Sequence, residues 1–468
     1  MKVVVREPAS SGRRIDLLES APRLRRIVLS RGFQPILMLV MLAPFVLAIV
    51  AGLVGTSAGN RNFGIVFVWI VWWALLMVFL VPGLGRAWCT VCPIPAPGEW
   101  VQRRGIVGGS NRLRTMGLRW PRRLRNMWTQ NTGFLLLALF STVILTRPSI
   151  SAGVILGMAG VALGMSLLFE KRVFCRYVCP IGGFIGLYSM TAPVELRVRD
   201  RQVCVDHRTK DCITGNERGY GCPWMVYPGK LDRNLDCGLC TECLKTCTMD
   251  NVVVNLRRPG ADLGRPVRSK KVDEAFKALI MLACSIIYPA VLFGPWSTIK
   301  EWAAFESFVG WALYAAGFLA ATLLVVPGLF WLAAAAAARR SCGGLSVRQT
   351  FNEYAHALIP IGLAAWIAFS VGFALTNGSY ALAAVSDPLG WGWNLFGTRD
   401  AGWTPFLSGT APGIQAAIIL SGLVFSLRTG LRIGFRHDPS GATAVRATAP
   451  VAMFLLVCTM ALLWLYLG

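Results

Sequence analysis

The sequence predicts an all-α polytopic membrane protein with about nine transmembrane helices and a small cytoplasmic insert rich in cysteine. Hydrophobic residues make up 55% of the 468 residues and charged residues only 15%, and the mean hydropathy is +0.55. A soluble protein carries about a quarter charged residues. The composition therefore excludes an ordinary soluble globular domain and favours an integral membrane protein with a polar insert.

The predicted spans fall into two groups on either side of the polar insert. The first four lie near Pro35–Val54, Phe63–Leu80, Gly133–Leu145 and Ile150–Phe169. The other five lie near Ala278–Phe293, Phe308–Ala338, Ala357–Leu375, Ile414–Leu427 and Val451–Leu467. Two of the stretches are short, so the count carries a margin of about one span. The chain is divided into a basic arm (1–33), a four-helix membrane unit (34–194), the insert (195–272) and a five-helix membrane region (273–468).

Basic residues sort almost completely to one side of the predicted membrane. Only four of the 47 Lys and Arg residues fall in loops on the other side, namely Arg61, Arg147, Lys300 and Arg399. The positive-inside rule places the basic side, with the N-terminus and the insert, in the cytoplasm. The net charge of +24 then reflects topology and contact with anionic lipid, and no nucleic-acid partner is expected. In a reducing compartment, metal-binding or redox thiols are favoured over structural disulfides.

Four closely spaced cysteines dominate the insert: Cys237, Cys240, Cys243 and Cys247. This C-x2-C-x2-C-x3-C spacing lets three thiolates reach three irons of one [4Fe–4S] cube, while the fourth takes the remaining iron or serves a second cluster. Thiolates are soft ligands that suit iron–sulfur chemistry. A zinc site seldom needs four cysteines so close together, and a disulfide framework needs an oxidising compartment. The run therefore predicts a ferredoxin-like iron–sulfur insert.

Three further cysteines allow a second cluster in the insert. They are Cys204, Cys212 and Cys222, the last of which is followed by proline. In two-cluster ferredoxins the final cysteine of each motif crosses over to the other cluster. By that logic one cluster is bound by Cys222, Cys237, Cys240 and Cys243. The other is bound by Cys247 together with Cys204 and Cys212.

The second predicted ligand set has three cysteines, one fewer than a [4Fe–4S] cluster with four thiolate ligands needs. A non-cysteine ligand (His207, Asp206 or Asp211), a [3Fe–4S] cluster or a cysteine from another segment would make up the deficit. His207 is itself better explained as a solvated loop histidine. The simpler alternative is a single cluster bound by Cys237, Cys240, Cys243 and Cys247. The cysteine count favours two clusters over one.

Two helix ends carry matching cysteine pairs. Cys89 and Cys92 follow the second span, Cys175 and Cys179 follow the fourth, and Pro-Ile comes after each pair. The two helix pairs thus resemble one repeated unit that delivers its cysteines to the same depth. Either all four join around a metal or cluster, or each pair works as a dithiol/disulfide couple, and convergence of the four is favoured. The neighbouring Arg86, Arg172 and Arg176 are expected at the membrane interface, where they offset thiolate charge.

The remaining spans carry few chemical groups. C-x-x-C-H is absent, so covalent c-type haem is not expected. Trp69, Trp72 and Trp73 in the second span are interpreted as aromatic packing or a lipid-facing stripe. No acids pair within a span, which disfavours an ion-coupled transporter.

Paired helix-end Cys-Pro motifs followed by a cytoplasmic ferredoxin segment resemble the NosR/NapH-type membrane ferredoxins and the oxidase-assembly ferredoxins of the CcoG type. The resemblance covers roughly residues 63–250. It implies a protein of the bacterial cytoplasmic (inner) membrane that passes electrons between a quinone pool or cytoplasmic donor and a redox partner. The sequence departs from the family pattern in the shorter spacing of the first helix-end pair, in the missing insert cysteine and in the five additional C-terminal spans.

Two functions are consistent with these residues. The first is a membrane electron-transfer subunit, with [4Fe–4S] clusters at the cytoplasmic face and a quinone or redox protein as partner, and not a stand-alone enzyme. The second is an assembly factor whose thiols and clusters reduce or deliver a metal to a respiratory enzyme. The first is the leading hypothesis.

Overall fold

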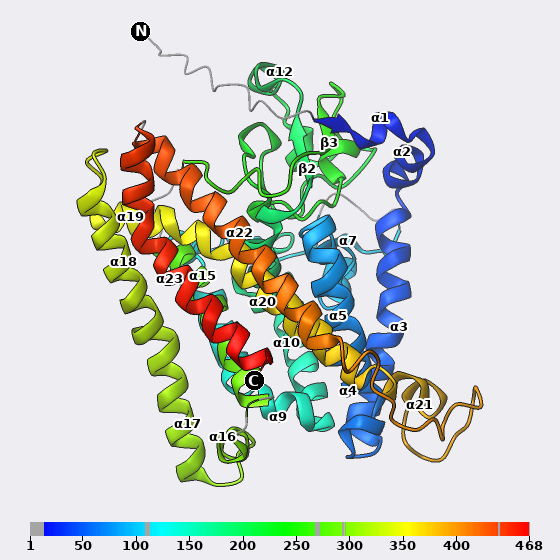
Figure 1. Ribbon diagram of the computed structural model, residues 1–468. Coiled ribbons are helices and arrows are strands. Elements are labelled where there is room, and N and C mark those ends of the chain that lie inside the picture. Colours follow the sequence, from blue (N-terminus) through cyan, green and yellow to red (C-terminus); the bar gives the residue numbers. More distant parts are fainter. Residues whose placement is uncertain are drawn as a thin grey trace.

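A layer of long helices carries the cysteine-rich insert at one end (Figure 1). The computed structural model describes residues 14–107, 113–266, 272–292, 294, 296–438 and 440–467. The first 13 residues of the predicted basic arm lie outside these described residues.

Eight helical segments of the described chain are long and apolar enough to cross a membrane. Five are single helices: α3 (Phe33–Val54), α10 (Pro148–Leu168), α15 (Val272–Leu292), α22 (Ala411–His437) and α23 (Gly441–Leu467). Phe63–Leu84 comprises α4 (Phe63–Ile65), η2 (Val66–Trp72), α5 (Trp73–Leu75) and η3 (Leu76–Leu84). Phe308–Arg340 comprises α17 (Phe308–Ala320), η9 (Ala321–Val325) and α18 (Val326–Arg340). Val347–Asn377 comprises α19 (Val347–Tyr354), η10 (Ala355–Ala357) and α20 (Leu358–Asn377).

The predicted stretch Gly133–Leu145 does not form one helix of spanning length. The chain instead forms α8 (Trp128–Leu139) and α9 (Ser141–Thr146), which are separated at Phe140. Before α8, the backbone N–H of Met127 donates to Asp273 Oδ2 at 2.7 Å, beside the insert. After α9, the carbonyl of Thr146 packs against Gly59 at the opposite end of the layer. The two helices together therefore connect the two ends, as the predicted single span would.

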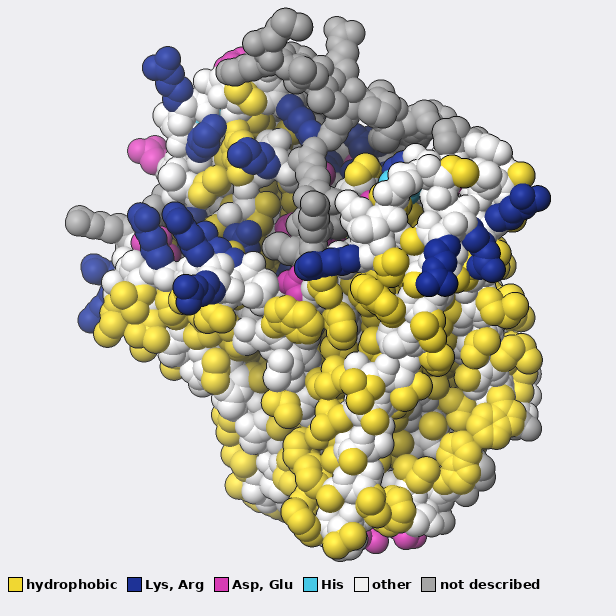
Figure 2. Space-filling view, turned by 90° about the vertical axis from the view of Figure 1, so that its left-hand side faces the viewer, with side chains coloured by type: hydrophobic (Ala, Val, Ile, Leu, Met, Phe, Trp, Pro, Cys, Tyr) yellow, Lys and Arg dark blue, Asp and Glu magenta, His cyan; other side chains and the backbone are white. Residues whose placement is uncertain are grey.

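The two ends of the helix layer differ in charge. On the face shown in Figure 2, Lys and Arg side chains gather at the end that carries the insert, and the surface below them is largely hydrophobic. This distribution agrees with the sorting of basic residues in the sequence, and with the apolar helices it indicates a membrane protein. Which end faces the cytoplasm stays a prediction.

Helix α20 lies inside the helix layer and is buried along most of its length. It packs against α15 and α22, and α22 packs against α23. Trp366 of α20 is 1% exposed and donates from Nε1 to the carbonyl of Met281 in α15. A helix that is apolar on all sides needs such an interior position.

The insert contains a three-stranded antiparallel sheet with the strand order β1-β3-β2. β2 (Val194–Val198) pairs with β3 (Val252–Leu256). β1 (Ile15–Asp16) belongs to the predicted basic arm and pairs with Asn255 and Leu256, the last two residues of β3. The short helices α12 (Arg201–Asp206), α13 (Asp211–Thr214) and α14 (Glu242–Lys245) lie between β2 and β3 in the sequence. The sheet therefore joins the two ends of the cysteine-bearing loop.

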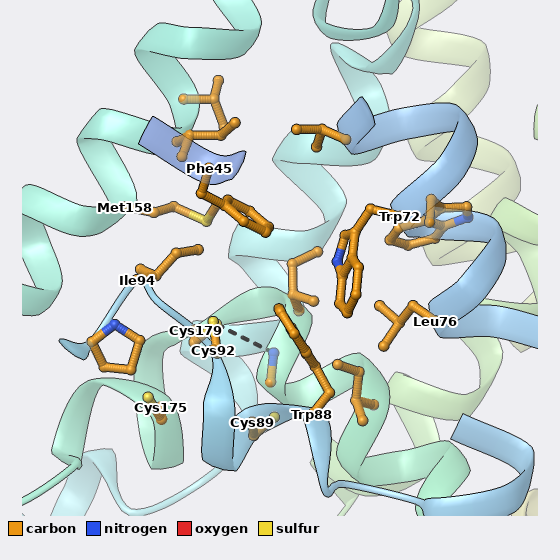
Figure 3. Close-up of a pocket in the computed structure, with 18 of the residues that line it drawn as sticks. Phe45, Trp72, Leu76, Trp88, Cys89, Cys92, Ile94, Met158, Cys175 and Cys179 are labelled. Carbon is orange, nitrogen blue, oxygen red and sulfur yellow. Dashed lines mark hydrogen bonds between the residues drawn. The ribbon is translucent and has the colours of Figure 1, made fainter. Parts of the chain in front are cut away.

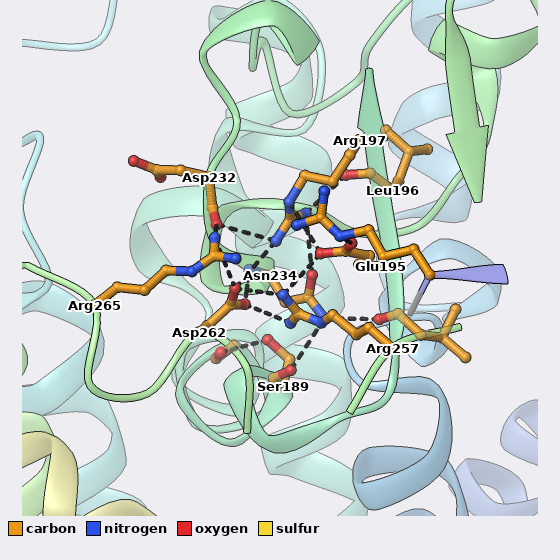
Figure 4. Close-up of polar contacts among 12 residues, drawn as sticks. Ser189, Glu195, Leu196, Arg197, Asp232, Asn234, Arg257, Asp262 and Arg265 are labelled. Atoms are coloured by element: carbon orange, nitrogen blue, oxygen red, sulfur yellow. Dashed lines mark hydrogen bonds and ion pairs between the residues drawn. The ribbon is translucent and has the colours of Figure 1, made fainter. Parts of the chain in front are cut away.

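A buried ionic cluster, formed by Glu195, Arg197, Arg257 and Asp262, holds the base of this loop (Figure 4). Asp262 accepts from Arg257 at 2.5 and 2.7 Å and from Arg197 at 3.2 Å. Burial opposes the charge of Asp262, but the hydrogen bonds from Arg257 and the charge of Arg197 hold its pKa below the usual range. The backbone N–H of Asn234 also donates to Asp262, at 2.7 Å. Because Asn234 shortly precedes Cys237, the cluster positions the start of the cysteine run.

Candidate functional site

The structure brings the four helix-end cysteines together around one apolar cavity of about 90 Å³ (Figure 3). We call them the helix-end group: Cys89, Cys92, Cys175 and Cys179. Cys89 lies in the short helix α6 (Trp88–Val91), and Cys175 lies in η5 (Phe174–Val178). Cys179 caps α11 (Pro180–Tyr188), and its Sγ accepts from the backbone N–H of Gly182 at 3.2 Å. Proline at the first position of α11 is favourable there, because its missing N–H would have no partner within the helix.

Two buried arginines connect the halves of the helix-end group. Arg86, which precedes the first cysteine pair, donates from Nη2 to the carbonyl of Cys175 at 2.9 Å. Arg172, which precedes the second pair, donates from Nη1 to the carbonyl of Cys89 at 2.5 Å. Arg172 also forms an ion pair with Glu99. Both arginines are about 95% buried, at 5% and 4% exposed. Both side chains are therefore enclosed by protein, and their predicted depth at the membrane interface stays a prediction.

The seven insert cysteines fall into two groups in space. The proximal group is Cys222, Cys237, Cys240 and Cys243, and the neighbouring thiols of the group contribute to raising the pKa of Cys237, Cys240 and Cys243. The distal group is Cys204, Cys212 and Cys247. These are the two sets that the crossover logic predicts, although binding of clusters by them stays a prediction.

Asn251 connects two members of the distal group directly. Its side-chain amide donates to Cys204 Sγ at 3.2 Å, and its backbone N–H donates to Cys247 Sγ at 3.3 Å. In the proximal group, the backbone N–H groups of Val226 and Leu239 donate to the sulfurs of Cys222 and Cys237, both at 3.4 Å. Hydrogen bonds to sulfur of this kind tune the reduction potential of a cluster.

The loop between Cys237 and Cys243 has an unusual backbone. Leu239 and Thr241 have φ values of 53° and 59°, in the left-handed region that side-chain-bearing residues seldom adopt. Such conformations cluster at functional sites, where the surrounding structure maintains them. Here the turn at Leu239 directs its N–H to the sulfur of Cys237.

In each of the three groups, burial raises the pKa of at least one thiol. It raises the pKa of Cys179, Cys212 and Cys237 to about 11. A thiol in such surroundings is neutral unless a cation stabilises the thiolate, and iron binds the thiolate. Buried cysteines with amide donors to sulfur therefore fit an iron–sulfur cluster.

The side chains considered as non-cysteine ligands, His207, Asp206 and Asp211, lie near the distal group but form no hydrogen bond to its sulfurs. His207 Nε2 lies 3.4 Å from Thr248 Oγ1 and 4.0 Å from Asp211 Oδ2, and Asp206 accepts from Gln202. Among the described residues, no three His, Cys, Asp or Glu side chains are placed to hold a single metal ion. A cube presents a different iron to each thiolate, so its ligands stand farther apart than those of one ion.

The helix-end and proximal groups are neighbours. Thr90, between Cys89 and Cys92, donates from Oγ1 to the carbonyl of Gly238 at 2.6 Å. Arg86 donates from Nη1 to the carbonyl of Leu235 at 2.8 Å, and its guanidinium lies 4.4 Å from the ring centroid of Trp224. The side-chain amide of Gln34 bonds to the carbonyl of Cys240. The backbone N–H of Cys222 in turn donates to the carbonyl of Cys212 at 2.8 Å, so the distal, proximal and helix-end groups are successive neighbours.

The sequence analysis missed a set of buried charges at the insert end of α15. Glu274 accepts from Arg233 at 2.6 Å and lies 2.9 Å from His356 Nε2, and Lys277 donates to Gln130 at 2.8 Å. Glu274 lies in the first turn of α15, before the predicted span Ala278–Phe293, so the prediction that no acids pair within a span is not tested by it. Its partners lie in the insert and in η10, so no local sequence pattern announces the pairing.

The tryptophans of the second span pack toward the helix-end group. Trp72 lies 3.8 Å from Trp88 between ring centroids, and Trp73 lies 6.0 Å from Trp366. Trp69, Trp72 and Trp73 all line the apolar cavity beside the cysteines (Figure 3). Of the two interpretations made from the sequence, aromatic packing holds.

Comparison with known proteins supports iron–sulfur binding. A family described as "4Fe-4S binding domain" matches residues 65–123 and 151–200, the stretches that contain the helix-end group. The chain is 26% identical over 98 residues to the proposed electron transport protein YccM of Escherichia coli, which covers 20% of this chain and 25% of that protein. It is 28% identical over 83 residues to protein MJ0750 of Methanocaldococcus jannaschii, which covers 18% and 30%. The matched stretch thus spans less than a third of either relative. No solved structure shows significant similarity.

Proposed function

We propose that this protein conducts electrons between a cytoplasmic donor and the quinone pool or a membrane redox partner, through clusters bound by the three cysteine groups. The observation that carries this proposal is that 11 of the 14 cysteines fall into three successive groups ending at an apolar cavity in the helix layer. The family match to a 4Fe–4S binding domain and the similarity to YccM support it.

Each group has a distinct place in the proposed path. The proximal group would hold one [4Fe–4S] cluster, and the distal group an irregular second cluster with three thiolates. The helix-end group would hold a third, a role supported by the match of residues 65–123 and 151–200. Bound clusters supply one-electron carriers, whose potentials depend on ligands, hydrogen bonds and burial.

The protein's own side chains would favour reduction along the path. Arg86 and Arg172 bring two buried positive charges beside the helix-end group. Positive charge stabilises the reduced state of a nearby cluster, since reduction adds an electron. Because Arg86 also donates to the carbonyl of Leu235 near Cys237, this charge would favour reduction at the proximal and helix-end groups alike.

A quinone would enter the path from the membrane side of the helix-end group. The cavity beside the cysteines adjoins a second one of about 50 Å³, and Trp69 and Trp73 line both. The second cavity also contains the side chains of Ser141 and Tyr288. Aromatic side chains suit a quinone ring, and hydroxyl groups can donate to its carbonyl oxygens.

Iron content and EPR of three serine variants test this proposal. The purified wild-type protein is expected to contain about eleven or twelve irons, depending on the type of distal cluster. Cys179→Ser should lose about four irons and react slowly with a quinol analogue, and Cys243→Ser should lose about four irons and the proximal EPR signal. The control Cys342→Ser changes an exposed cysteine outside the three groups and should match the wild type.

Each unexpected result of these measurements would rule out a different part of the proposal. Unchanged iron in Cys179→Ser would exclude a helix-end cluster and leave the insert clusters standing. About four irons in the wild type would contradict separate clusters at the three groups. Copper bound at the helix-end group without quinol reactivity would favour the assembly-factor alternative.

A further inference from the structure

A large polar cavity lies beside the helix-end and proximal groups. Its volume is about 960 Å³, and its wall comes from the segment 117–127, from the region of η5 and α11, and from the insert. Small-molecule sites range from roughly 300 to 1,000 Å³. Arg176, next to Cys175, and Asp236, next to Cys237, both line it. A ligand in this cavity would therefore lie close to both the helix-end and the proximal group.

The wall of this cavity is strongly basic. Five arginines line it: Arg86, Arg119, Arg122, Arg125 and Arg176. The acidic residues on the wall are Glu170 and Asp236. Within the part of the chain that the structure describes, none of the five guanidinium groups forms an ion pair with a carboxylate. We call this site the arginine cavity.

Two of the arginines are fixed and three are accessible. Arg86 is held by the carbonyls of Cys175 and Leu235, and Arg176 by the carbonyls of Trp224 and Met225. Arg119, Arg122 and Arg125 are exposed on the segment before α8. The cavity thus combines two held arginines with three exposed ones, of which Arg125 donates to the carbonyl of Trp120 at 3.3 Å.

A buried lysine lies behind the floor. Lys277 is fully buried, and its Nζ donates at 2.8 Å to Gln130 Oε1, a residue of the cavity wall. The backbone of Gly183, also on the wall, leaves room for this side chain, since a Cβ there would lie 2.4 Å from Lys277 Nζ. Lys277 therefore supports the wall of the cavity from behind.

We propose that the arginine cavity binds a phosphate-bearing anion, either the headgroup of an acidic phospholipid or a soluble phosphate compound. Guanidinium groups match phosphate oxygens with paired hydrogen bonds, and several of them without carboxylate partners favour a ligand with more than one negative charge. The cavity lies at the depth of the headgroups, because Leu118 on its wall bridges to Phe169 at the end of α10. Basic pockets at this depth of membrane proteins bind acidic lipids.

An anion bound in the arginine cavity would also change the reduction potentials of the clusters, an effect that rests on the proposed function. Negative charge beside the helix-end and proximal groups disfavours the addition of an electron. Occupancy of the arginine cavity therefore lowers the reduction potentials of both clusters, and the cavity acts as an electrostatic control on the electron path.

A pair of charge-matched double variants tests the binding site. Arg119→Gln with Arg122→Gln removes two exposed arginines of the cavity. Arg114→Gln with Arg123→Gln removes two exposed arginines of the same segment that do not line it. Each full-length protein is placed in phosphatidylcholine nanodiscs and titrated with pyrophosphate by calorimetry. In a parallel arm, each is extracted from membranes containing phosphatidylglycerol, and the lipid retained per chain is measured by mass spectrometry.

The expected result is about tenfold weaker binding of one probe to the cavity variant, with wild-type binding by the control variant. Binding of pyrophosphate identifies a soluble ligand, and selective retention of phosphatidylglycerol identifies a lipid. The proposal is overturned if the wild type binds neither probe, or if both double variants weaken binding equally. Iron content is measured on the same samples, so failure of the cavity proposal is distinguished from failure of the cluster assignment.

Discussion

At the scale of single residues, the arginine before each helix-end cysteine pair bonds to the other pair. Arg86 reaches the carbonyl of Cys175, and Arg172 reaches the carbonyl of Cys89. A buried charge is tolerated only when its hydrogen-bonding groups are satisfied, so these exchanged bonds hold the halves in one arrangement. The repeated motif indicates that the two cysteine pairs are equivalent, but it does not reveal that each arginine bonds to the opposite pair.

Asn251 is expected to set the potential of the distal cluster. Replacing it by alanine removes the amide that donates to Cys204 Sγ. Because a hydrogen bond to sulfur stabilises the reduced cluster, Asn251→Ala should lower the distal midpoint potential by on the order of 50 mV. EPR-monitored redox titration measures this shift. The proximal signal serves as the internal control, since its donors from Val226 and Leu239 are backbone groups; an equal shift of both signals would contradict a local effect.

Gly238 is expected to tolerate no side chain. A Cβ at this position would lie 2.0 Å from Nε1 of the buried Trp224. Gly238→Ala should therefore displace the loop between Cys237 and Cys240, destabilise the insert by about 1–3 kcal/mol and reduce the iron bound by the proximal group. Iron analysis and thermal denaturation measure the two effects. Gly164→Ala in α10 is the control, since a Cβ there meets nothing within 4 Å, and it should bind iron as the wild type does.

At the scale of elements, the insert depends on segments that are distant in the sequence. β1 from the N-terminal arm completes the sheet beside β3. The buried ionic cluster joins β2 and β3 to the turn at Asn234. The cysteine spacing predicted which insert cysteines lie together, whereas the sheet and its ionic cluster could not be predicted, because their pairings depend on long-range contacts and not on local periodicity.

The buried ionic cluster is expected to be essential for the insert. Asp262→Asn leaves Arg197 and Arg257 buried with less compensating charge, which costs about 3–5 kcal/mol. The midpoint of thermal denaturation in detergent should fall by at least about 5 °C. Asp250→Asn is the matched control, because Asp250 forms an exposed ion pair with Arg25, and such pairs contribute at most about 1 kcal/mol. Equal midpoints for the two variants would show that the cluster is not critical.

At the scale of the whole molecule, the cysteine groups and the basic loops share one end of the helix layer. The insert, the helix-end group and the arginine cavity all lie there. The opposite end carries the loop that follows α21 (Tyr380–Ser386). Electrons entering at the insert would therefore stay near one membrane surface until they reach the helix-end group.

The orientation of the basic end can be measured with Cys342. Among the cysteines, all of which the structure describes, only Cys342 is exposed, and it lies between α18 and α19 at the basic end. If this end faces the cytoplasm, a membrane-impermeant maleimide should label Cys342 in inverted vesicles and not in intact spheroplasts.

A cysteine at the other end provides the matched control. In a Cys342→Ser background, Asp400→Cys introduces a thiol at a side chain that is 88% exposed in the opposite loop. It should be labelled in spheroplasts only. The reverse pattern for both positions would invert the orientation.

The sequence by itself determined that this is a membrane protein, which cysteines form sets and which loops are basic. Those properties follow from composition, from residue spacing and from charge counts, all of which can be measured along the chain. Only the tertiary structure decided that Arg86 and Arg172 exchange partners, that Gly133–Leu145 divides into α8 and α9, and that five arginines surround one cavity. These features depend on which distant segments pack together, and burial then decides which charges must find a partner.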